Sequence, residues 1–364
     1  MPPLVQTLGV ITVEPLGVMV PGPAAAGVDC LSANNNLDLT RFDGRLWLAW
    51  RTAPSHFASA EARLEVSSAP GPEGPWHHEV TVALGADLRE PRWVIHQGRL
   101  QLWFMKLGTD PKRFQPQGVY RLSTDGRSWT SPEPAVQESV VPWRIAKLQN
   151  RWAMIGYRGA EKMYSARPAD PVVELRWSDD LESWSSPTDL HSGGTECELV
   201  ELPDGQILGL TRNEGPSRRG GDLLLGPDLE HLSVTPISQK PDSPNLFLWQ
   251  GKPFVFARRQ LAFGGRYDHM PSWVPGAVAI RVDQAVWSVT RKRSALFSVN
   301  TDAPSLDWVL DLPSCGDTAF AAVVHEPDGS ILVADYSSVL SGGDPMWLRG
   351  QLRPTQISLY RLRR

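Results

Sequence analysis

The sequence predicts an all-β protein, and three observations support this. A unit of apolar strand, tight turn and second apolar strand is repeated six times along the chain. Most intervals between successive turns are about fifty residues, the length of one four-stranded blade, and the last is longer by one insertion. Short alternating runs such as 99–106 and 206–212 read as strands, while helical periodicity is scarce. The six turns lie at Asp43-Gly44, Gln97-Gly98, Gln149-Asn150, Asp204-Gly205, Gln250-Gly251 and Asp328-Gly329.

A second pattern follows most of these turns, in which Ser-x-Asp precedes a Trp. An Asp in such a turn caps backbone amides, and the Trp fills the groove between neighbouring blades. The pattern is therefore expected to support the fold rather than catalysis. It is clearest at Ser123, Asp125 and Trp129 and at Ser178, Asp180 and Trp184.

The period and the length together predict a six-bladed β-propeller. The chain has 364 residues, of which 41% are hydrophobic, and no linker divides it, so residues 1–364 are interpreted as one domain. Residues 10–13 and 357–362 both read as strands. We expect these terminal strands to complete one shared blade, which removes the last open sheet edge.

Composition excludes several classes of function. A formal net charge of -4 with mixed signs gives no basic face for nucleic acid. No segment is apolar and long enough to span a bilayer, and no secretory signal is visible. The sparse, odd set Cys30, Cys197 and Cys315 favours reduced thiols and a cytoplasmic location. No metal-ligand spacing or phosphate-binding loop predicts a cofactor. The oligomeric state stays open.

The topology of the repeat predicts where a site lies. If the first strand of each unit lines the central channel, the residues before it and after the second strand surround one mouth. Arg51, Arg212 and Arg258 occupy the same slot of three units. Guanidinium groups from separate blades suit a carboxylate or another anion, which arginine binds through two hydrogen bonds. The alternative is that each arginine pairs with a neighbouring Asp or Glu at a blade rim. Further candidate substrate-binding residues near this mouth are Arg89, Arg92, Arg144, Arg158, His56 and Tyr336.

Carboxylates at the same positions indicate glycoside hydrolysis, which usually needs one carboxylic acid and one carboxylate. Glu90 and Glu196 are the predicted catalytic pair, with Asp38 as a third candidate. Strand alternation places Glu198 on the face of Glu196, so both or neither are expected to point into the channel. Rim carboxylates that only pair with arginines are the alternative. The aromatic segment 263–273 suits a sugar-stacking lid.

The sixfold repeat with these turns resembles the sialidase superfamily of Asp-box six-bladed propellers, and Gly316-Asp317-Thr318-Ala319-Phe320 with Tyr336 is similar to its last blade. The resemblance implies an arginine triad for the substrate carboxylate, a Tyr nucleophile assisted by Glu, and an Asp acid/base. Phe320 stands where the last-blade Tyr would be expected, and the motif carrying the first Arg is absent.

A second resemblance is to the five-bladed furanosidases, through Arg89-Glu90-Pro91 and Glu196-Cys197. The count of six units argues against five blades.

Together these features predict a cofactor-independent glycosidase that acts on a terminal, acidic sugar of a carbohydrate. Two alternatives stay open. One is a non-catalytic propeller that binds glycan or protein on the same face, since fold does not decide function. The other is a lyase in which Tyr, His and Arg around a uronate remove a proton.

Overall fold

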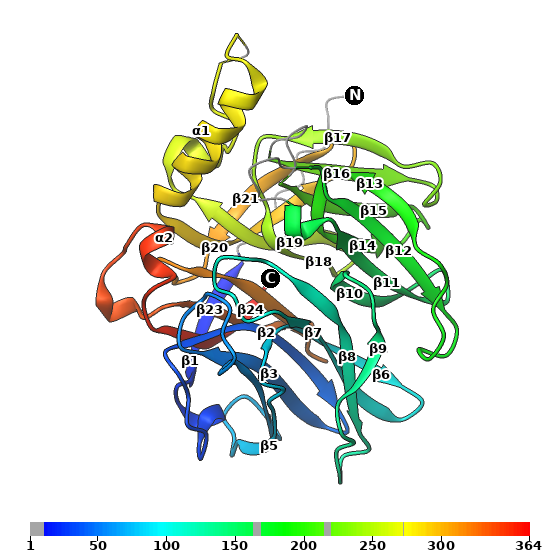
Figure 1. The fold of residues 1–364 in the computed structure, drawn as a ribbon, viewed down its shortest axis with the longest axis vertical. Helices are drawn as coiled ribbons and strands as arrows, with labels where there is room; N and C mark the ends of the chain where they lie inside the picture. Colours follow the sequence, from blue (N-terminus) through cyan, green and yellow to red (C-terminus); the bar gives the residue numbers. More distant parts are fainter. Residues whose placement is uncertain (1–10, 163–168, 215–219, 272) are drawn as a thin grey trace.

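Six four-stranded antiparallel sheets form a six-bladed β-propeller in the computed structural model, which describes residues 11–162, 169–214, 220–271 and 273–364 (Figure 1). The predicted fold class is confirmed. The first two blades are β2 (Ala33–Phe42), β3 (Arg45–Ala53), β4 (Arg63–Ala69) and β5 (His77–Val82), then β6 (Asp87–His96), β7 (Arg99–Leu107), β8 (Pro116–Thr124) and β9 (Glu133–Val136). The next two are β10 (Val141–Leu148), β11 (Arg151–Arg158), β12 (Val172–Ser178) and β13 (Thr188–Ser192), then β14 (Gly194–Glu201), β15 (Ile207–Asn213), β16 (Gly221–Gly226) and β17 (Ser233–Ile237). The fifth is β18 (Asp242–Trp249), β19 (Lys252–Gln260), β20 (Lys292–Asn300) and β21 (Ser305–Asp311).

The sixth blade joins the two ends of the chain. It contains β22 (Thr318–His325), β23 (Ile331–Ser338) and β24 (Thr355–Arg363), with β1 (Thr12–Val20) added at its outer edge. Thr12 pairs with Arg363, and the blue and red ends of the chain lie together in Figure 1. The predicted closure is confirmed, although β1 extends further than expected and residue 10 lies outside the described part.

The predicted tight turns connect the first two strands of every blade. Asp43 and Gly44 have φ of 48° and 70°, and Gln97 and Gly98 have 48° and 72°. Two successive positive φ values are typical of the type I′ turn, whose twist matches that of the flanking strands. The local turn chemistry therefore sets the strand pairing of each blade.

The Asp and Trp of the outer turns also act as predicted. Asp180 Oδ1 accepts hydrogen bonds from the backbone N–H groups of Glu182 and Ser183, at 2.8 and 2.9 Å. Trp184 packs edge-on against Trp103 of the preceding blade, with ring centroids 5.8 Å apart. These turns join neighbouring blades and lie outside the candidate site.

The first strands of the six blades surround the centre. β2 contacts both β6 and β22, while β14 contacts both β10 and β18, which closes the ring. The apolar core lies between adjacent blades; one cluster, for example, combines Trp50, Leu332 and Leu359 from the first and last blades. This arrangement leaves the ends of the inner strands to form the channel mouth.

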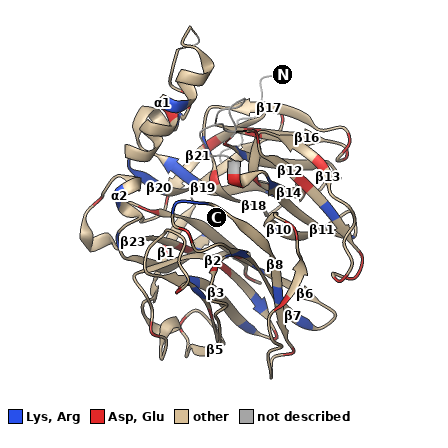
Figure 2. Ribbon diagram, in the orientation of Figure 1, with Lys and Arg blue, Asp and Glu red and all other residues tan. Residues whose placement is uncertain are grey.

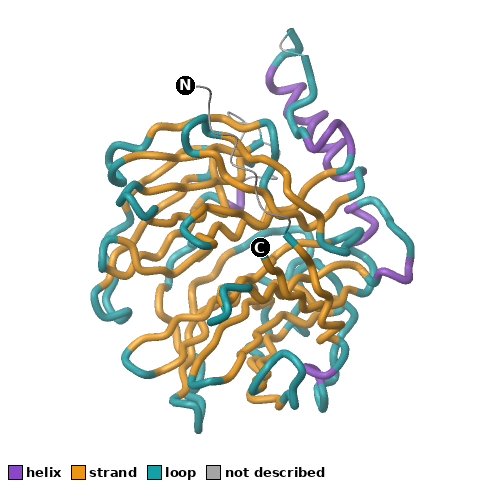
Figure 3. The backbone as a smooth tube through the Cα atoms, turned by 180° about the vertical axis from the view of Figure 1, so that it is seen from behind, coloured by secondary structure: helices purple, strands orange, loops and turns teal. Residues whose placement is uncertain are grey.

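The two α-helices of the described residues lie on one side of the propeller. α1 (Gly276–Val289) projects outward, and α2 (Trp347–Gly350) lies beside its base (Figure 1 and Figure 3). Both are insertions, α1 between β19 and β20 and α2 between β23 and β24. Within the described residues no helix has the length and apolarity needed to cross a bilayer. Lys, Arg, Asp and Glu are intermixed over the blades in Figure 2. Short 3₁₀ turns occur at Pro23–Ala25, Ala160–Lys162, Ala262–Gly265 and Leu340–Gly342.

Candidate functional site

A cavity of about 340 Å³ lies at the channel mouth. Its base comes from the inner strands, and its walls come from the loop after β3, residues 111–114 after β7, and α2. Seven of the predicted site residues line it together: His56, Arg89, Glu90, Glu196, Arg212, Arg258 and Tyr336. The repeat topology therefore brings residues from five blades into one place.

A β-bulge in the inner strand of each blade shapes this cavity. In five of the six strands the bulge places a non-glycine residue in the left-handed region, which is sparsely populated and costs about 1 kcal/mol or more per residue. A bulge re-aims the side chain at its position. All five of these residues line the cavity: Asn36 (φ 41°), Glu90 (φ 55°), Glu196 (φ 43°), Ser243 (φ 52°) and Phe320 (φ 60°).

The bulge in β14 places Glu196 and Glu198 at different depths of the channel. The register shifts between Thr195 and Glu198, so the alternation is broken at this point of β14. Glu196 lines the cavity, whereas Glu198 forms a two-pronged ion pair with Arg144 of the neighbouring blade, at 2.7 and 3.1 Å. Only one of the two carboxylates is therefore at the mouth.

Glu90 and Glu196 are buried carboxyls with different partners. Glu90 accepts a hydrogen bond from Asn36 Nδ2 at 3.2 Å and lies 3.4 Å from Arg92 Nη2. Burial raises its pKa to about 7; the Arg92 guanidinium opposes the shift and the Glu196 carboxylate adds to it. Glu196 accepts from the Ser243 N–H at 2.7 Å and pairs with Arg212 at 2.9 Å. Burial also raises the pKa of Glu196, and the Arg212 cation opposes this.

Three arginines give the cavity a positive character. Arg89 is held by Asp87 at 2.6 Å, and Arg258 is held by Asp242 at 2.8 Å. Arg212 pairs with Glu196 and comes from β15 of the fourth blade. The three guanidinium groups come from different blades, so they surround the cavity and favour an anionic group within it.

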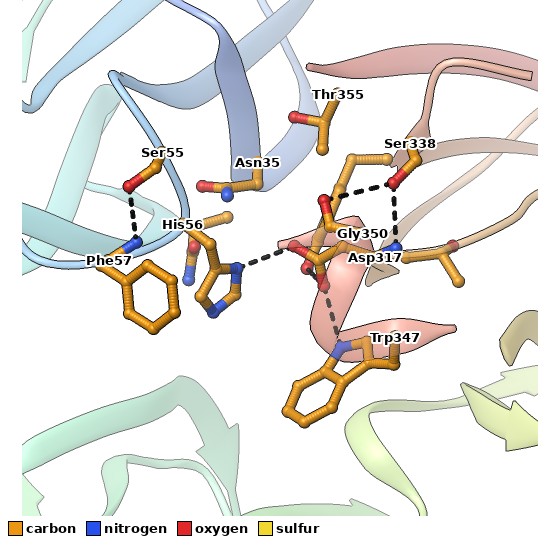
Figure 4. A network of polar contacts seen from close by, with 12 residues as sticks. Asn35, Ser55, His56, Phe57, Asp317, Ser338, Trp347, Gly350 and Thr355 are labelled. Atoms are coloured by element: carbon orange, nitrogen blue, oxygen red, sulfur yellow. Dashed lines mark hydrogen bonds and ion pairs between the residues drawn. The ribbon is translucent and has the colours of Figure 1, made fainter. Parts of the chain in front are cut away.

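A histidine and a buried aspartate form a hydrogen-bonded pair on one wall (Figure 4). His56 Nδ1 lies 2.8 Å from Asp317 Oδ2, while Asp317 Oδ1 accepts from Tyr336 Oη at 3.2 Å and from Trp347 Nε1 at 3.0 Å. Although burial opposes it, interaction with His56, Arg258 and Trp347 lowers the pKa of Asp317. A carboxylate acceptor puts the proton on Nδ1, and the other ring nitrogen of His56 points away from Asp317 in Figure 4. This pair can accept or donate a proton at the cavity wall.

An aromatic layer separates the cavity from a second set of charges deeper in the channel. The rings of Trp143 and Phe320 pack against each other, with centroids 5.4 Å apart, and the Arg92 guanidinium lies over both, 4.7 and 5.4 Å from their centroids. Phe320 and Ser243 line both the mouth cavity and a void of about 10 Å³, which also contacts Asp38 and Arg144. We call Asp38, Arg92, Arg144 and Glu198 the floor network.

Five predicted site residues do not line the cavity. Asp38, Arg92 and Arg144 belong to the floor network, where Asp38 accepts the Trp93 N–H at 2.8 Å. The fully buried Arg51 turns to Asp87 Oδ1 at 2.7 Å, so it does not point to the mouth with Arg212 and Arg258 as expected. Arg158 points outward to Asp189 at 2.7 and 2.8 Å. Arg51, Arg144 and Arg158 are therefore held away from the mouth by carboxylates that do not line it, namely Asp87, Glu198 and Asp189.

The predicted lid is also placed elsewhere. Phe263 stacks on His269, with ring centroids 4.3 Å apart, and Trp273 is 82% exposed. Neither residue lines the mouth cavity. The residues that close its side instead are Phe57, Phe114, Trp347 and Gln351.

Sequence reasoning placed Asn36 and Asp317 beside the inner strands at the mouth but assigned them no role, and it left out Ser243 and Trp347. Asn36 and Ser243 occupy the same bulge position as Glu90 and Glu196, so aligning the six units on their inner strands would have found them. Trp347 lies in an insertion and carries no repeat signal. In the described part of the chain, no group of three or more His, Cys, Asp or Glu residues is arranged to hold a metal ion.

Comparisons with known proteins agree with the architecture. No family model and no curated protein matches the chain. Among solved structures it is similar to a Dyadobacter fermentans protein of unknown function, with TM-score 0.63, 14% identity, and 91% of this chain and 94% of that one covered. It is also similar to Trypanosoma rangeli sialidase in complex with the inhibitor DANA, with TM-score 0.61, 11% identity, and 91% and 55% covered. The chain has the sialidase-like six-bladed propeller fold.

A third similar structure extends this group. Phage phi92 endosialidase matches with TM-score 0.61 and 11% identity, covering 97% of this chain and 69% of that one. The chain spans about half the length of the Trypanosoma rangeli sialidase, as 55% of the latter is covered. At such identities the likeness shows the fold, so the activity has to be argued from the site.

Proposed function

We propose that the protein is a glycoside hydrolase that cleaves the glycosidic bond of an acidic sugar bound in the mouth cavity. One observation carries the proposal: Glu90 and Glu196 lie in one cavity with Arg89, Arg212 and Arg258. The arginines would bind the carboxylate of the sugar, and the carboxyl pair would act on its anomeric centre. The sialidase-like fold of the chain supports the same class of reaction.

The environments of the two carboxyls assign their roles. Because the pKa of Glu90 is raised to about 7, this group holds its proton near neutral pH and serves as the general acid for the leaving oxygen. Glu196 is paired with the Arg212 cation and accepts a backbone N–H, so it serves as the carboxylate partner. It would act as the nucleophile or as the base that activates water. The reaction needs no cofactor.

A specific observation favours a second function, elimination from a uronate. The His56–Asp317 pair offers a ring nitrogen on the cavity wall that could remove the proton beside the sugar carboxylate. The C–O bond to the leaving group would then break, and that oxygen would take a proton. The product would carry a carbon–carbon double bond that absorbs in the ultraviolet, which a hydrolase product does not.

The test is a panel of aryl glycosides and natural glycans with sialic acids, uronic acids and furanosides. The wild-type protein is compared with Glu90→Gln and Glu196→Gln, and with Glu201→Gln as a control. Glu201 is an exposed residue of the same strand as Glu196 and does not line the cavity. Hydrolysis predicts release of one acidic sugar, lost about 10²-fold or more in both site variants and unchanged in the control.

Other results would point elsewhere. An ultraviolet-absorbing product that His56→Ala abolishes would replace hydrolysis by elimination. Binding of an acidic glycan without turnover of any compound would leave a non-catalytic glycan-binding propeller.

A further inference from the structure

A second cavity, of about 380 Å³, lies between α1 and the propeller next to the mouth cavity. Arg212 and Trp347 line both cavities, so the two share a wall. We call this second cavity the helix pocket. It uses residues to which the proposed reaction assigns no role, including Tyr267 and the inner face of α1.

Trp347 connects the two cavities physically. Its indole N–H donates to Asp317 on the mouth side, at 3.0 Å, while its backbone N–H donates to the Thr290 carbonyl just after α1, also at 3.0 Å. The Arg258 guanidinium lies 5.0 Å from its ring centroid. A ligand in the mouth cavity and one in the helix pocket would therefore contact opposite sides of a shared structural unit.

The face of α1 that lines the pocket is polar apart from Ala285 and Trp287. Arg281, Gln284, Ala285 and Ser288 follow the spacing i, i+3, i+4, i+7, which places them on one side of the helix. In a helix that only packs on a core, the inward face is expected to be apolar. This face instead offers a guanidinium, an amide and a hydroxyl to the cavity.

Aromatic rings complete the lining of the pocket, Tyr267 from the segment before α1 and Trp287 from α1 itself. Tyr267 and Trp287 line the pocket, with ring centroids 5.6 Å apart. Trp287 is only 3% exposed, yet within the described residues its Nε1–H donates no hydrogen bond. Trp287 therefore offers the pocket part of its ring, while its N–H is enclosed by the protein.

The charges of the pocket favour an anion. Lys240 pairs with both Glu214 and Asp242, and Asp242 also pairs with Arg258, so two cations balance the two carboxylates inside the protein. Arg281 of the helix is exposed and adds a further positive charge. Aromatic faces, hydrogen-bond donors and cations together suit a sugar that carries a carboxylate.

We propose that the helix pocket binds the sugar next to the one held in the mouth cavity, so that the protein acts on acidic oligosaccharides of two or more units. The inference rests on the proposed function for the mouth cavity and adds its substrate class. Because the two cavities share Arg212 and Trp347, adjacent units of one chain can occupy them at once. Linking two binding events in this way raises affinity without a new contact in the first site.

The test measures binding as a function of chain length. The probes are oligogalacturonates and sialic acid oligomers of one to four units, titrated by calorimetry into Glu90→Gln, which is impaired in cleavage. At least one series should bind about tenfold or more tightly as a dimer than as a monomer. Arg281→Ala and Gln284→Ala, added to Glu90→Gln, should remove this gain and leave monomer binding unchanged. The matched control is Arg291→Ala, since Arg291 is exposed and lines neither cavity.

Two results would overturn the inference: equal binding of monomer and dimer in both series, or a dimer gain that survives both helix variants. Absence of binding by every oligomer would do the same. Turnover by the wild-type protein is assayed in parallel. A dimer gain without turnover would reject only the hydrolase, whereas turnover without a dimer gain would reject only the helix pocket.

Discussion

The mouth and the floor of the central channel contain the same kinds of charged side chain, and they differ in where those charges are directed. At the mouth, Glu196 and Arg212 pair with each other and also line a cavity of about 340 Å³. In the floor network, Glu198 and Arg144 form a two-pronged pair beside a void of about 10 Å³. Charged groups at the mouth can thus contact a ligand, whereas those of the floor network are enclosed by protein.

The comparison of Glu196 with Glu198 gives the largest expected effect. Glu196→Gln should lower kcat about 10²–10⁴-fold, because it removes a carboxylate that acts on the substrate. Its unfolding free energy should change less than that of Glu198→Gln, since the amide oxygen can still accept from the Ser243 N–H and Arg212 retains Glu214 at 3.7 Å. Glu198→Gln should cost about 3–5 kcal/mol of stability, because Arg144 loses its buried partner. Steady-state kinetics and urea unfolding would check both. Equal losses of activity and equal losses of stability in the two variants would remove the distinction between mouth and floor.

A comparison of two arginines sharpens the same distinction. Arg212→Lys should raise KM about tenfold for an acidic substrate, because a single ammonium cannot replace a fork-like contact, a loss of about 1.4 kcal/mol. Arg92→Lys should change KM much less and lower the melting temperature, since the Arg92 guanidinium packs over the rings of Trp143 and Phe320. Steady-state kinetics and thermal unfolding are the measurements. A larger KM effect at Arg92 would mean that the floor contacts substrate.

The pH dependence tests whether Glu90 is the acid. A general acid must be protonated, and burial raises the pKa of Glu90 to about 7, so kcat/KM should fall as the pH rises through about 7. Well above this pKa, kcat/KM should fall tenfold for each pH unit. Stability should also fall as the pH rises, because the folded state holds this proton more tightly than the unfolded chain. The contribution of Glu90 to the free energy of unfolding therefore declines between about pH 4.5 and 7. A profile of kcat/KM that rises through pH 7 would instead indicate that Glu90 acts as a base.

The difference between local and long-range determinants explains how far the sequence predicts this molecule. Strand pairs and turns depend on neighbouring residues: Asp43-Gly44 adopts the two positive φ values that its chemistry favours, and the blades were predicted correctly. The bulges depend on packing around the channel. Glu90 and Glu196 have no local preference for the left-handed region, so strand alternation alone did not separate Glu196 at the mouth from Glu198 in the floor network.

The helical insertion escaped prediction for a related reason. α1 begins at Gly276 after Pro275 and has no side-chain cap, so the usual signal for a helix start is missing. The ion-pair partners of the arginines could not be predicted from the sequence either. Arg51, Arg212 and Arg258 occupy one slot of the repeat, yet Arg51 turns to Asp87, a residue of another blade. Position in the repeat therefore predicts where the backbone of a residue lies, while the ion-pair partner decides where its side chain points.

Substitution of Asp335 should have the smallest effect on function. This residue differs from the carboxylates of both the mouth cavity and the floor network. It is buried on β23, and in the described part of the chain its hydrogen-bond donors are the hydroxyls of Ser294 and Thr318, at 2.8 and 3.4 Å. Burial raises its pKa to about 8, so the folded state binds a proton that the unfolded chain releases near pH 4. Its contribution to stability is therefore greatest below about pH 4 and declines up to about pH 8. Asp335→Asn should remove this decline and make the protein more stable at pH 8 than the wild type, by about 1 kcal/mol or more. Urea unfolding from pH 5 to 8 measures it, with kcat followed in parallel. An unchanged pH slope would show that Asp335 is ionised in the fold, and a large loss of kcat would place it in the reaction rather than behind it.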